Sequence, residues 1–229
     1  MIPSSPRRAL VFTIVSSALY FGPDLLMPKA WSASADYNFY YACYQSALVV
    51  VAFWFSPAIC RSMVVRKLDS ETIIGRAGES ICNLPLTIFD HPVPFVLTAG
   101  LLPAQCEIFL SKGFTDRLTL PGRRFLLARA TTHGSWIQRL GAFVPALLFA
   151  WFFPGIPDSL KAWLDMAAFL GLWLLLHWGL ELSVDRAAAR LCGAGAIDGL
   201  RDLLAVTNPH NSRLTTQPPP GWRVRAVRG

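Results

Sequence analysis

The residues best suited to chemistry lie near the end of an apolar run in the second half of the chain. Glu181 and Asp185 are four residues apart, and His177 precedes Glu181 by the same interval. This spacing places all three on one face of a helix. A further histidine, His133, follows Arg129 by four residues, so that pair also shares a helical face. Histidine and carboxylate groups are typical zinc ligands, so one hypothesis is an altered zinc site of His133, His177 and Glu181.

Other enzyme chemistries find less support. The chain contains no Gly-x-Ser-x-Gly motif and no glycine-rich phosphate loop. Its five cysteines show no paired spacing, which predicts reduced thiols rather than a disulfide framework. The net charge of +7 is not accompanied by any recognisable nucleic-acid module, so no nucleic-acid partner is expected.

The elements that must position these residues are strongly apolar. Hydrophobic residues make up 53% of the chain and charged residues 15%, against about 25% charged residues in soluble domains. We expect four transmembrane helices, at about 9–27, 40–59, 140–157 and 162–180. A fifth apolar region, 85–106, contains Asp90, His91 and four prolines, which favour short strands and turns.

The distribution of basic residues predicts the orientation of these spans. Of the 21 Lys and Arg residues, only Lys29 and Lys161 fall in the two predicted outer loops. The others lie in the N-terminal tail, in the segment 60–139 and in the C-terminal part of the chain after residue 180. By the positive-inside rule, both termini and the 60–139 segment are then cytoplasmic, and anionic lipid headgroups account for much of the net charge.

The cytoplasmic segment 60–139 is expected to be a small α+β unit. Val93–Thr98 and Cys106–Leu110 have the composition of short strands. The sequence Thr119-Leu-Pro-Gly is a helix-start signal, and the helix it opens is expected to run toward the third span. A further helix is expected over 181–207. The tail, 208–229, is rich in Pro and Arg and is expected to have little structure.

This order of parts resembles the HtpX-type membrane zinc peptidases and, more distantly, the BlaR-type sensor peptidases. Two spans, a strand-containing segment, a helix ending in His133, two further spans and then Glu181 follow one another as in those families. The run from Glu107 to Leu118 is similar to their edge-strand segment. The resemblance covers roughly residues 85–205 and implies a bacterial inner-membrane protein.

The resemblance also implies roles for individual residues. His133 corresponds to the second histidine of the His-Glu-x-x-His zinc motif, and Glu181 to the third zinc ligand. Asp185 corresponds to the acid one turn after that ligand. Arg129 stands where the first histidine is expected and Ala130 where the catalytic glutamate is expected. Arginine cannot coordinate a cation and alanine cannot act as a base, so peptide hydrolysis by the family mechanism is not expected.

Arg129 suggests what replaced the metal. It shares a helical face with His133, so its guanidinium could enter the vacated metal position and pair with Glu181 and Asp185. The alternative, that Arg129 is a solvated helix residue, stays open at this point.

The sequence therefore predicts a mainly α membrane protein, with four transmembrane helices and a small cytoplasmic metallopeptidase-like α+β portion. The predicted function is that of an inactive pseudopeptidase, an accessory, scaffold or peptide-binding subunit of a membrane complex. An extended peptide was expected to pair with residues 106–110. The alternatives are an active zinc peptidase using His133, His177 and Glu181, and a purely structural membrane subunit. No cofactor is expected except zinc under the first alternative.

Overall fold

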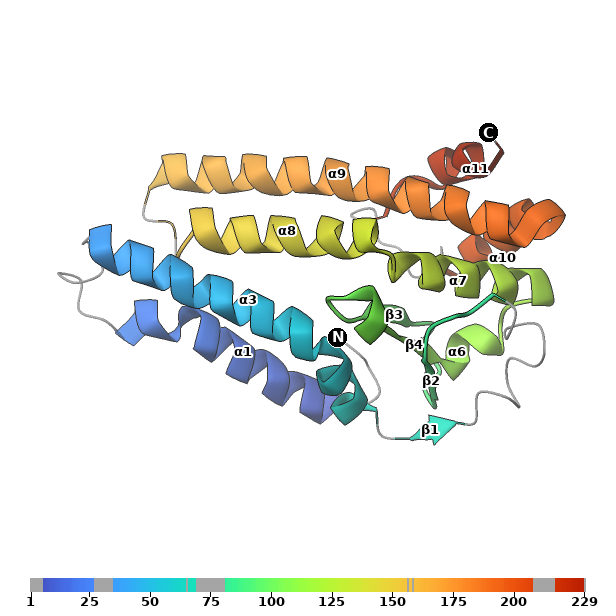
Figure 1. Cartoon of the computed structure of the whole chain (residues 1–229), viewed down its shortest axis with the longest axis horizontal. Coiled ribbons are helices and arrows are strands. Elements are labelled where there is room, and N and C mark those ends of the chain that lie inside the picture. The colour runs from blue at the N-terminus through green and yellow to red at the C-terminus, as the bar shows by residue number, and fades with distance from the viewer. Residues whose placement is uncertain are drawn as a thin grey trace.

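A computed structural model of the chain is mostly helical, with one small sheet at one end (Figure 1). It describes residues 6–26, 35–64, 66–68, 81–155, 157, 159–207 and 217–228. Lys29 and residues 208–216, which form the first part of the predicted tail, lie outside the described residues.

Four long helices lie side by side: α1 (Pro6–Leu26), α3 (Ala35–Met63), α8 (Trp136–Phe152) and α9 (Leu160–Cys192) (Figure 1). Each overlaps one of the four expected spans, with different bounds. Two helical segments of the described chain, Asp36–Met63 and Leu160–Thr207, are long and apolar enough to cross a membrane, whereas α8 is shorter. The structure thus has two membrane-capable helices, and the count of four spans stays a prediction.

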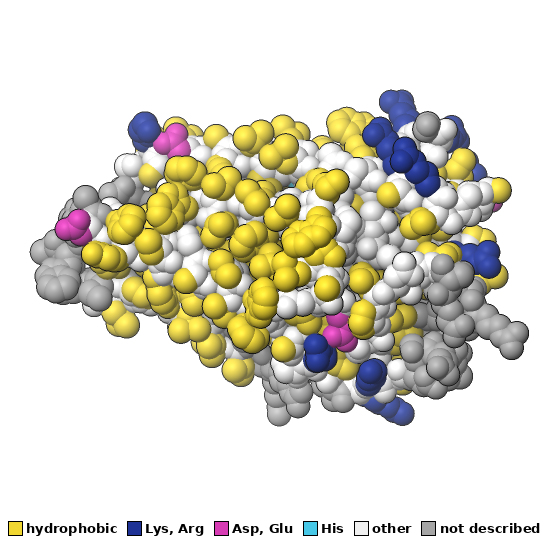
Figure 2. All heavy atoms as spheres, in the orientation of Figure 1, with side chains coloured by type: hydrophobic (Ala, Val, Ile, Leu, Met, Phe, Trp, Pro, Cys, Tyr) yellow, Lys and Arg dark blue, Asp and Glu magenta, His cyan; other side chains and the backbone are white. Residues whose placement is uncertain are grey.

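The apolar side chains of these helices face outward. Only 17% of the most apolar window of α3 and 11% of that of α9 is buried inside the protein. A core helix of a soluble protein would be mostly buried, so this exposure favours contact with lipid. Figure 2 shows hydrophobic side chains over most of the visible face of the long helices, with Lys and Arg mainly around the end that carries the sheet and α11 (Pro220–Arg228).

Helix α1 is joined to α3 through its own backbone carbonyls. Pro23 has no N–H to donate to the carbonyl of Leu19, four residues earlier. The Tyr44 hydroxyl of α3 donates to that carbonyl at 2.8 Å. The Tyr41 hydroxyl and the Gln45 amide donate to the next carbonyl, that of Tyr20, at 2.5 and 3.2 Å. Tyr44 of α3 therefore satisfies the carbonyl that the proline leaves open, and Tyr41 and Gln45 add contacts to the neighbouring carbonyl.

The sheet has the strand order β1-β2-β4-β3. Its strands are β1 (Lys67–Leu68), β2 (Leu86–Phe89), β3 (Val96–Ala99) and β4 (Glu107–Ser111). Strands β3 and β4 confirm the two predicted strand regions, and the 85–106 region forms β2, β3 and the short 3-10 helix η1 (Pro103–Gln105) instead of a span. Strands β1 and β2 were not predicted.

The expected peptide contact at 106–110 was wrong. Strand β4 pairs in parallel with β2 on one side, with Leu86 opposite Ile108. It pairs antiparallel with β3 on the other side, with Thr98 opposite Ile108. All five of its residues are buried. Its hydrogen-bonding edges are both occupied by strands of the same chain, so no extended partner can add to it.

Helix α7 (Leu120–His133) is fixed at its start by α10 (Ala196–Thr207). Thr119 caps α7 as predicted, its hydroxyl accepting from the Gly122 N–H. The Thr119 N–H and hydroxyl in turn donate to Asp202 of α10 at 2.7 and 2.6 Å. A short helix, α6 (Lys112–Thr115), connects β4 to this region. The main core fills the space between α7, α10 and the sheet and includes Phe125 and Leu200.

Two expected boundaries differ from the structure. Glu181 does not open a new helix, because α9 runs without interruption from the membrane-capable segment to Cys192. The break comes later, at the 3-10 turn η2 (Gly193–Gly195), where Gly193 has a φ of 63° that favours glycine. The expectation of an unstructured tail was wrong for 220–228, which forms α11 and packs on α9 (Figure 1).

Substitution of Gly199 by alanine is expected to destabilise the fold by about 2 kcal/mol or more. A Cβ at Gly199 would lie 2.6 Å from the Pro121 carbonyl oxygen and 2.8 Å from the Phe125 Cβ, so α10 and α7 would have to separate. Gly179→Ala in α9 is the control, because nothing lies within 4 Å of its Cβ position. Thermal unfolding in detergent should show a loss for Gly199→Ala only, and equal curves would contradict this account of helix packing.

Candidate functional site

The candidate site is centred on Arg129 of α7, whose exposed fraction is 6%. Its Nε donates to Asp185 Oδ1 at 2.7 Å, and its Nη2 donates to Glu181 Oε2. Both acids come from α9, where they lie one turn apart. Asp185 is 0% exposed and Glu181 is 6% exposed. The guanidinium therefore joins α7 to α9 through two buried carboxylates, which excludes the alternative of a solvated Arg129.

Asp185 is also held by a second arginine, Arg223 of α11. Arg223 Nε donates to Asp185 Oδ2 at 2.7 Å and Arg223 Nη2 donates to Oδ1 at 3.0 Å. This bidentate pair is buried, with Arg223 1% exposed. Arg223 Nη1 donates to Gln217 Oε1 at 3.0 Å. The tail of the chain thus returns to the site and contributes a charged residue to it.

These four side chains, Arg129, Glu181, Asp185 and Arg223, are called the ion quartet below. It contains two positive and two negative charges, so its formal charge is zero. Burial, together with the nearby charge of Arg223, lowers the pKa of Arg129 to about 10, while Asp185 opposes that shift. Arg129 accordingly stays protonated at neutral pH, and each buried charge has a partner of opposite sign.

Two histidines approach the remaining oxygen of Glu181. His133 Nε2 lies 3.6 Å and His177 Nε2 3.8 Å from Glu181 Oε1. Burial holds the pKa of His133 well below 6.5, and the positive charges of Arg129 and Arg139 lower it further. His133 is therefore neutral at physiological pH, so its contact with Glu181 is not an ion pair.

The end of α7 is positioned by β3 and by Arg139 of α8. The Thr98 hydroxyl of β3 donates to the Ala130 carbonyl at 2.9 Å. Arg139 Nε donates to the His133 carbonyl at 2.8 Å, and its Nη1 donates to the carbonyls of Thr98 and Gly100 at 2.9 and 3.1 Å. This arginine satisfies backbone groups at the break between α7 and α8, next to the site.

These residues do not fit a catalytic zinc centre. In the part of the chain that the structure describes, no group of three or more His, Cys, Asp and Glu side chains is placed to hold a metal ion. One oxygen of Glu181 is already bound by Arg129, and Asp185 accepts from two arginines. Two guanidinium charges beside the same carboxylates would repel a divalent cation. Ala130, at the position expected for the base, carries no group that could activate water.

The structure brings together most of the residues that the sequence singled out. Arg129, Glu181 and Asp185 meet, as the substitution hypothesis required, and His133 and His177 lie beside them. That the arginine replaces a metal stays a hypothesis. Arg223 was missed. A signal for its helix was present, because Pro220 is a favoured first helical residue and the eight residues after it contain no further proline.

Comparison with known proteins supports the fold. No family model and no curated protein matches the sequence. Among solved structures, the crystal structure of S. mikatae Ste24p matches with a TM-score of 0.56 and 14% sequence identity. The match covers 97% of this chain and 66% of Ste24p, so the chain spans about two thirds of that protein's length. At this identity the likeness shows the fold alone: the chain is folded like this part of Ste24p.

The neutral state of His133 predicts a pH dependence of stability. Its pKa is near 6.5 in the unfolded chain and lower in the folded protein. Between these two values the unfolded chain binds more protons, so stability falls as the pH falls below about 6.5 and levels off below the folded pKa. The melting temperature of the wild type should therefore drop more steeply than that of His133→Gln between about pH 7 and pH 5. Parallel curves for the two proteins would contradict the assignment.

Proposed function

We propose that this protein is a catalytically inactive, peptidase-like membrane protein that serves as an accessory or scaffold subunit of a membrane protein complex. The observation that carries the proposal is the position of Arg129, between the two carboxylates that a zinc peptidase of this type would use near its metal. The chain shares its fold with Ste24p, and the order of its parts resembles that of the HtpX-type membrane zinc peptidases. The proposed difference is one of chemistry on a similar fold.

In this proposal, arginines supply the positive charge that a metal ion would bring. A zinc ion between α7 and α9 would supply two positive charges that hold two helices together. In this chain Arg129 and Arg223 supply two positive charges to the carboxylates of α9. The helices are joined in the same region by ion pairs instead of coordination bonds. The site can then keep its shape without a metal, which is what a scaffold requires.

Zinc peptidases of the His-Glu-x-x-His type need a carboxylate that takes a proton from the metal-bound water. The corresponding residue, Ala130, is 3% exposed and lies in the interior of α7. Glu181 and Asp185 are both engaged by arginine and are poor candidates for that base. The arrangement stabilises structure and offers no group in the expected place to activate water.

One observation favours a second candidate function, an active zinc peptidase with an altered site. His133 Nε2 and His177 Nε2 both lie within 4 Å of Glu181 Oε1, and a displacement of Arg129 would free the other oxygen of Glu181. The guanidinium would have to leave a buried position and two carboxylates, at a cost of several kcal/mol. The other alternative, a purely structural membrane subunit, would differ from our proposal only in having no binding role.

The proposed setting is a multi-pass protein of a bacterial inner membrane, with four spans and both termini cytoplasmic. The concentration of Lys and Arg at 60–139 and in both tails supports this orientation. So do the two membrane-capable helices with their outward apolar faces. Lipid is then the principal environment of α3 and α9, and other membrane subunits would contact the same faces.

Elemental analysis of the detergent-purified protein tests the proposal. The wild type should contain far less than one zinc per chain and should not cleave a quenched peptide library. The double variant Arg129→His/Ala130→Glu, which restores the ligand and the base of the zinc motif, should retain more zinc than the wild type, because its donor set matches a three-ligand site.

Glu181→Ala in the wild-type background is the control. About one zinc per wild-type chain that disappears in Glu181→Ala would support the altered zinc peptidase and contradict our proposal. The quenched peptide library then shows whether that zinc is catalytic: cleavage by the wild type, lost with chelator, would establish an enzyme.

A further inference from the structure

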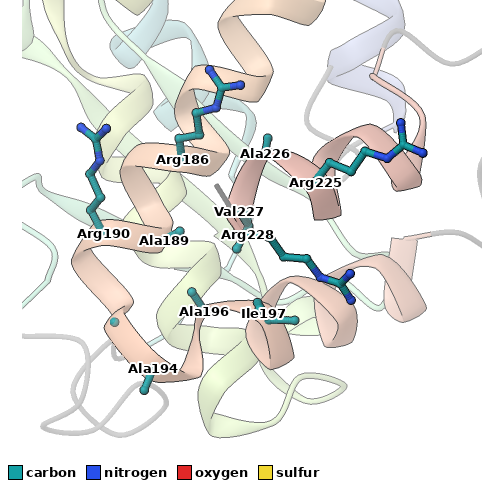
Figure 3. Close-up of a pocket in the computed structure, with 11 residues that line it drawn as sticks. Arg186, Ala189, Arg190, Ala194, Ala196, Ile197, Arg225, Ala226, Val227 and Arg228 are labelled. Carbon is teal, nitrogen blue, oxygen red and sulfur yellow. The ribbon is translucent and has the colours of Figure 1, made fainter.

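A pocket of about 620 Å³ lies on the side of α9 next to α11, separate from the ion quartet. It is bounded by the last turns of α9, the turn η2, the start of α10 and the end of α11 (Figure 3). Its floor consists of small and apolar side chains, among them Ala189, Ala196, Ile197 and Ala226. The volume is within the range of about 300–1,000 Å³ that is usual for small-molecule sites.

Four arginines lie at the rim of this floor, and their guanidinium ends point outward, away from one another (Figure 3). Arg186 and Arg190 extend from α9, one turn apart, and Arg225 and Arg228 extend from α11 (Figure 3). All four are exposed, and no acidic residue lines the pocket. In the described part of the chain none of the four forms an ion pair, in contrast to Arg129 and Arg223, which are fully paired. We call this feature the arginine pocket.

The arginine pocket carries a local excess of positive charge. The ion quartet next to it is neutral, so it does not compensate the four guanidinium groups. Because all four are exposed, water and salt screen their mutual repulsion, and each side chain has room to turn toward a bound anion. Guanidinium groups bind phosphate oxygens through paired N–H donors, and a phosphate carries more charge and more acceptor oxygens than a carboxylate. Four arginines without acids therefore suit a phosphate group better than a single carboxylate.

The location of the pocket indicates where such a group could come from. Trp178 of α9 and Trp222 of α11 make an edge-to-face contact with ring centroids 5.9 Å apart, and tryptophan is enriched at membrane interfaces. The arginines follow both tryptophans in sequence and lie beyond them on α9 and α11. The pocket is thus just outside the apolar part of the bundle, within reach of both lipid headgroups and soluble compounds.

We propose that the arginine pocket is a binding site for a phosphate-bearing anion, either a lipid headgroup or a soluble phosphate compound. An anion held by arginines of both helices would fix α11 against α9, adding to the Asp185–Arg223 pair. The proposal does not depend on whether the chain is an enzyme.

Binding by the full-length, detergent-purified protein tests this proposal with two probes. Inorganic pyrophosphate, titrated by calorimetry, represents a soluble ligand. Phosphatidylglycerol, compared with phosphatidylcholine for retention in native mass spectrometry, represents a lipid headgroup. The variant Arg190→Gln/Arg225→Gln removes one arginine from each helix, and both residues are exposed, so the fold should be retained. The control Lys112→Gln/Arg117→Gln removes the same charge from exposed residues outside the pocket.

The wild type should bind at least one probe, and the pocket variant should bind it about tenfold or more weakly, because guanidinium–phosphate contacts are lost. The control variant should match the wild type. Pyrophosphate binding would identify a soluble source, and selective retention of phosphatidylglycerol alone a lipid source. Equal weakening in both variants would show only general surface charge and overturn the proposal. So would binding of neither probe.

Discussion

The buried carboxylate of Asp185 is the group on which the arrangement of the site depends. It is 0% exposed and accepts hydrogen bonds from Arg129 of α7 and Arg223 of α11, while its own helix is α9. Three segments far apart in sequence are thus joined at one side chain. A charge in this position is tolerated only when it is fully paired, so the two arginines and Glu181 form a unit whose members cannot be changed independently.

The neutrality of that unit explains what surrounds it. His133 and His177 approach Glu181, and His133 stays uncharged because it is buried beside Arg129. A charged histidine would add a positive charge to a set that is already balanced. The same balance disfavours a divalent cation, since both carboxylates of α9 already have cationic partners. The stability of the site and its repulsion of a divalent cation therefore have one cause, the pairing of the α9 carboxylates with two arginines.

Much of this could be predicted from the sequence, and the reasons for the misses are physical. Helical periodicity placed Glu181 and Asp185 on one face of a helix, and Arg129 and His133 on one face of another, because these relations are local. That the two faces meet was expected from the resemblance to membrane zinc peptidases. Whether residues 106–110 lie at an edge depends on which strands flank them, and β2 was not recognised in a proline-containing segment. The tail was missed because its composition is polar, whereas its order comes from Arg223 and its partner in a distant helix.

A double-mutant cycle between Arg129 and Glu181 tests the central claim most directly. The free energy of unfolding would be measured in detergent for the wild type, Arg129→Met, Glu181→Gln and the double variant. We expect Arg129→Met to cost about 3–5 kcal/mol, because it leaves buried carboxylates unpaired. The double variant should cost about 2 kcal/mol less than the sum of the two single variants. Additive costs, or an Arg129→Met variant as stable as the wild type, would contradict the claim that this ion pair holds the site together.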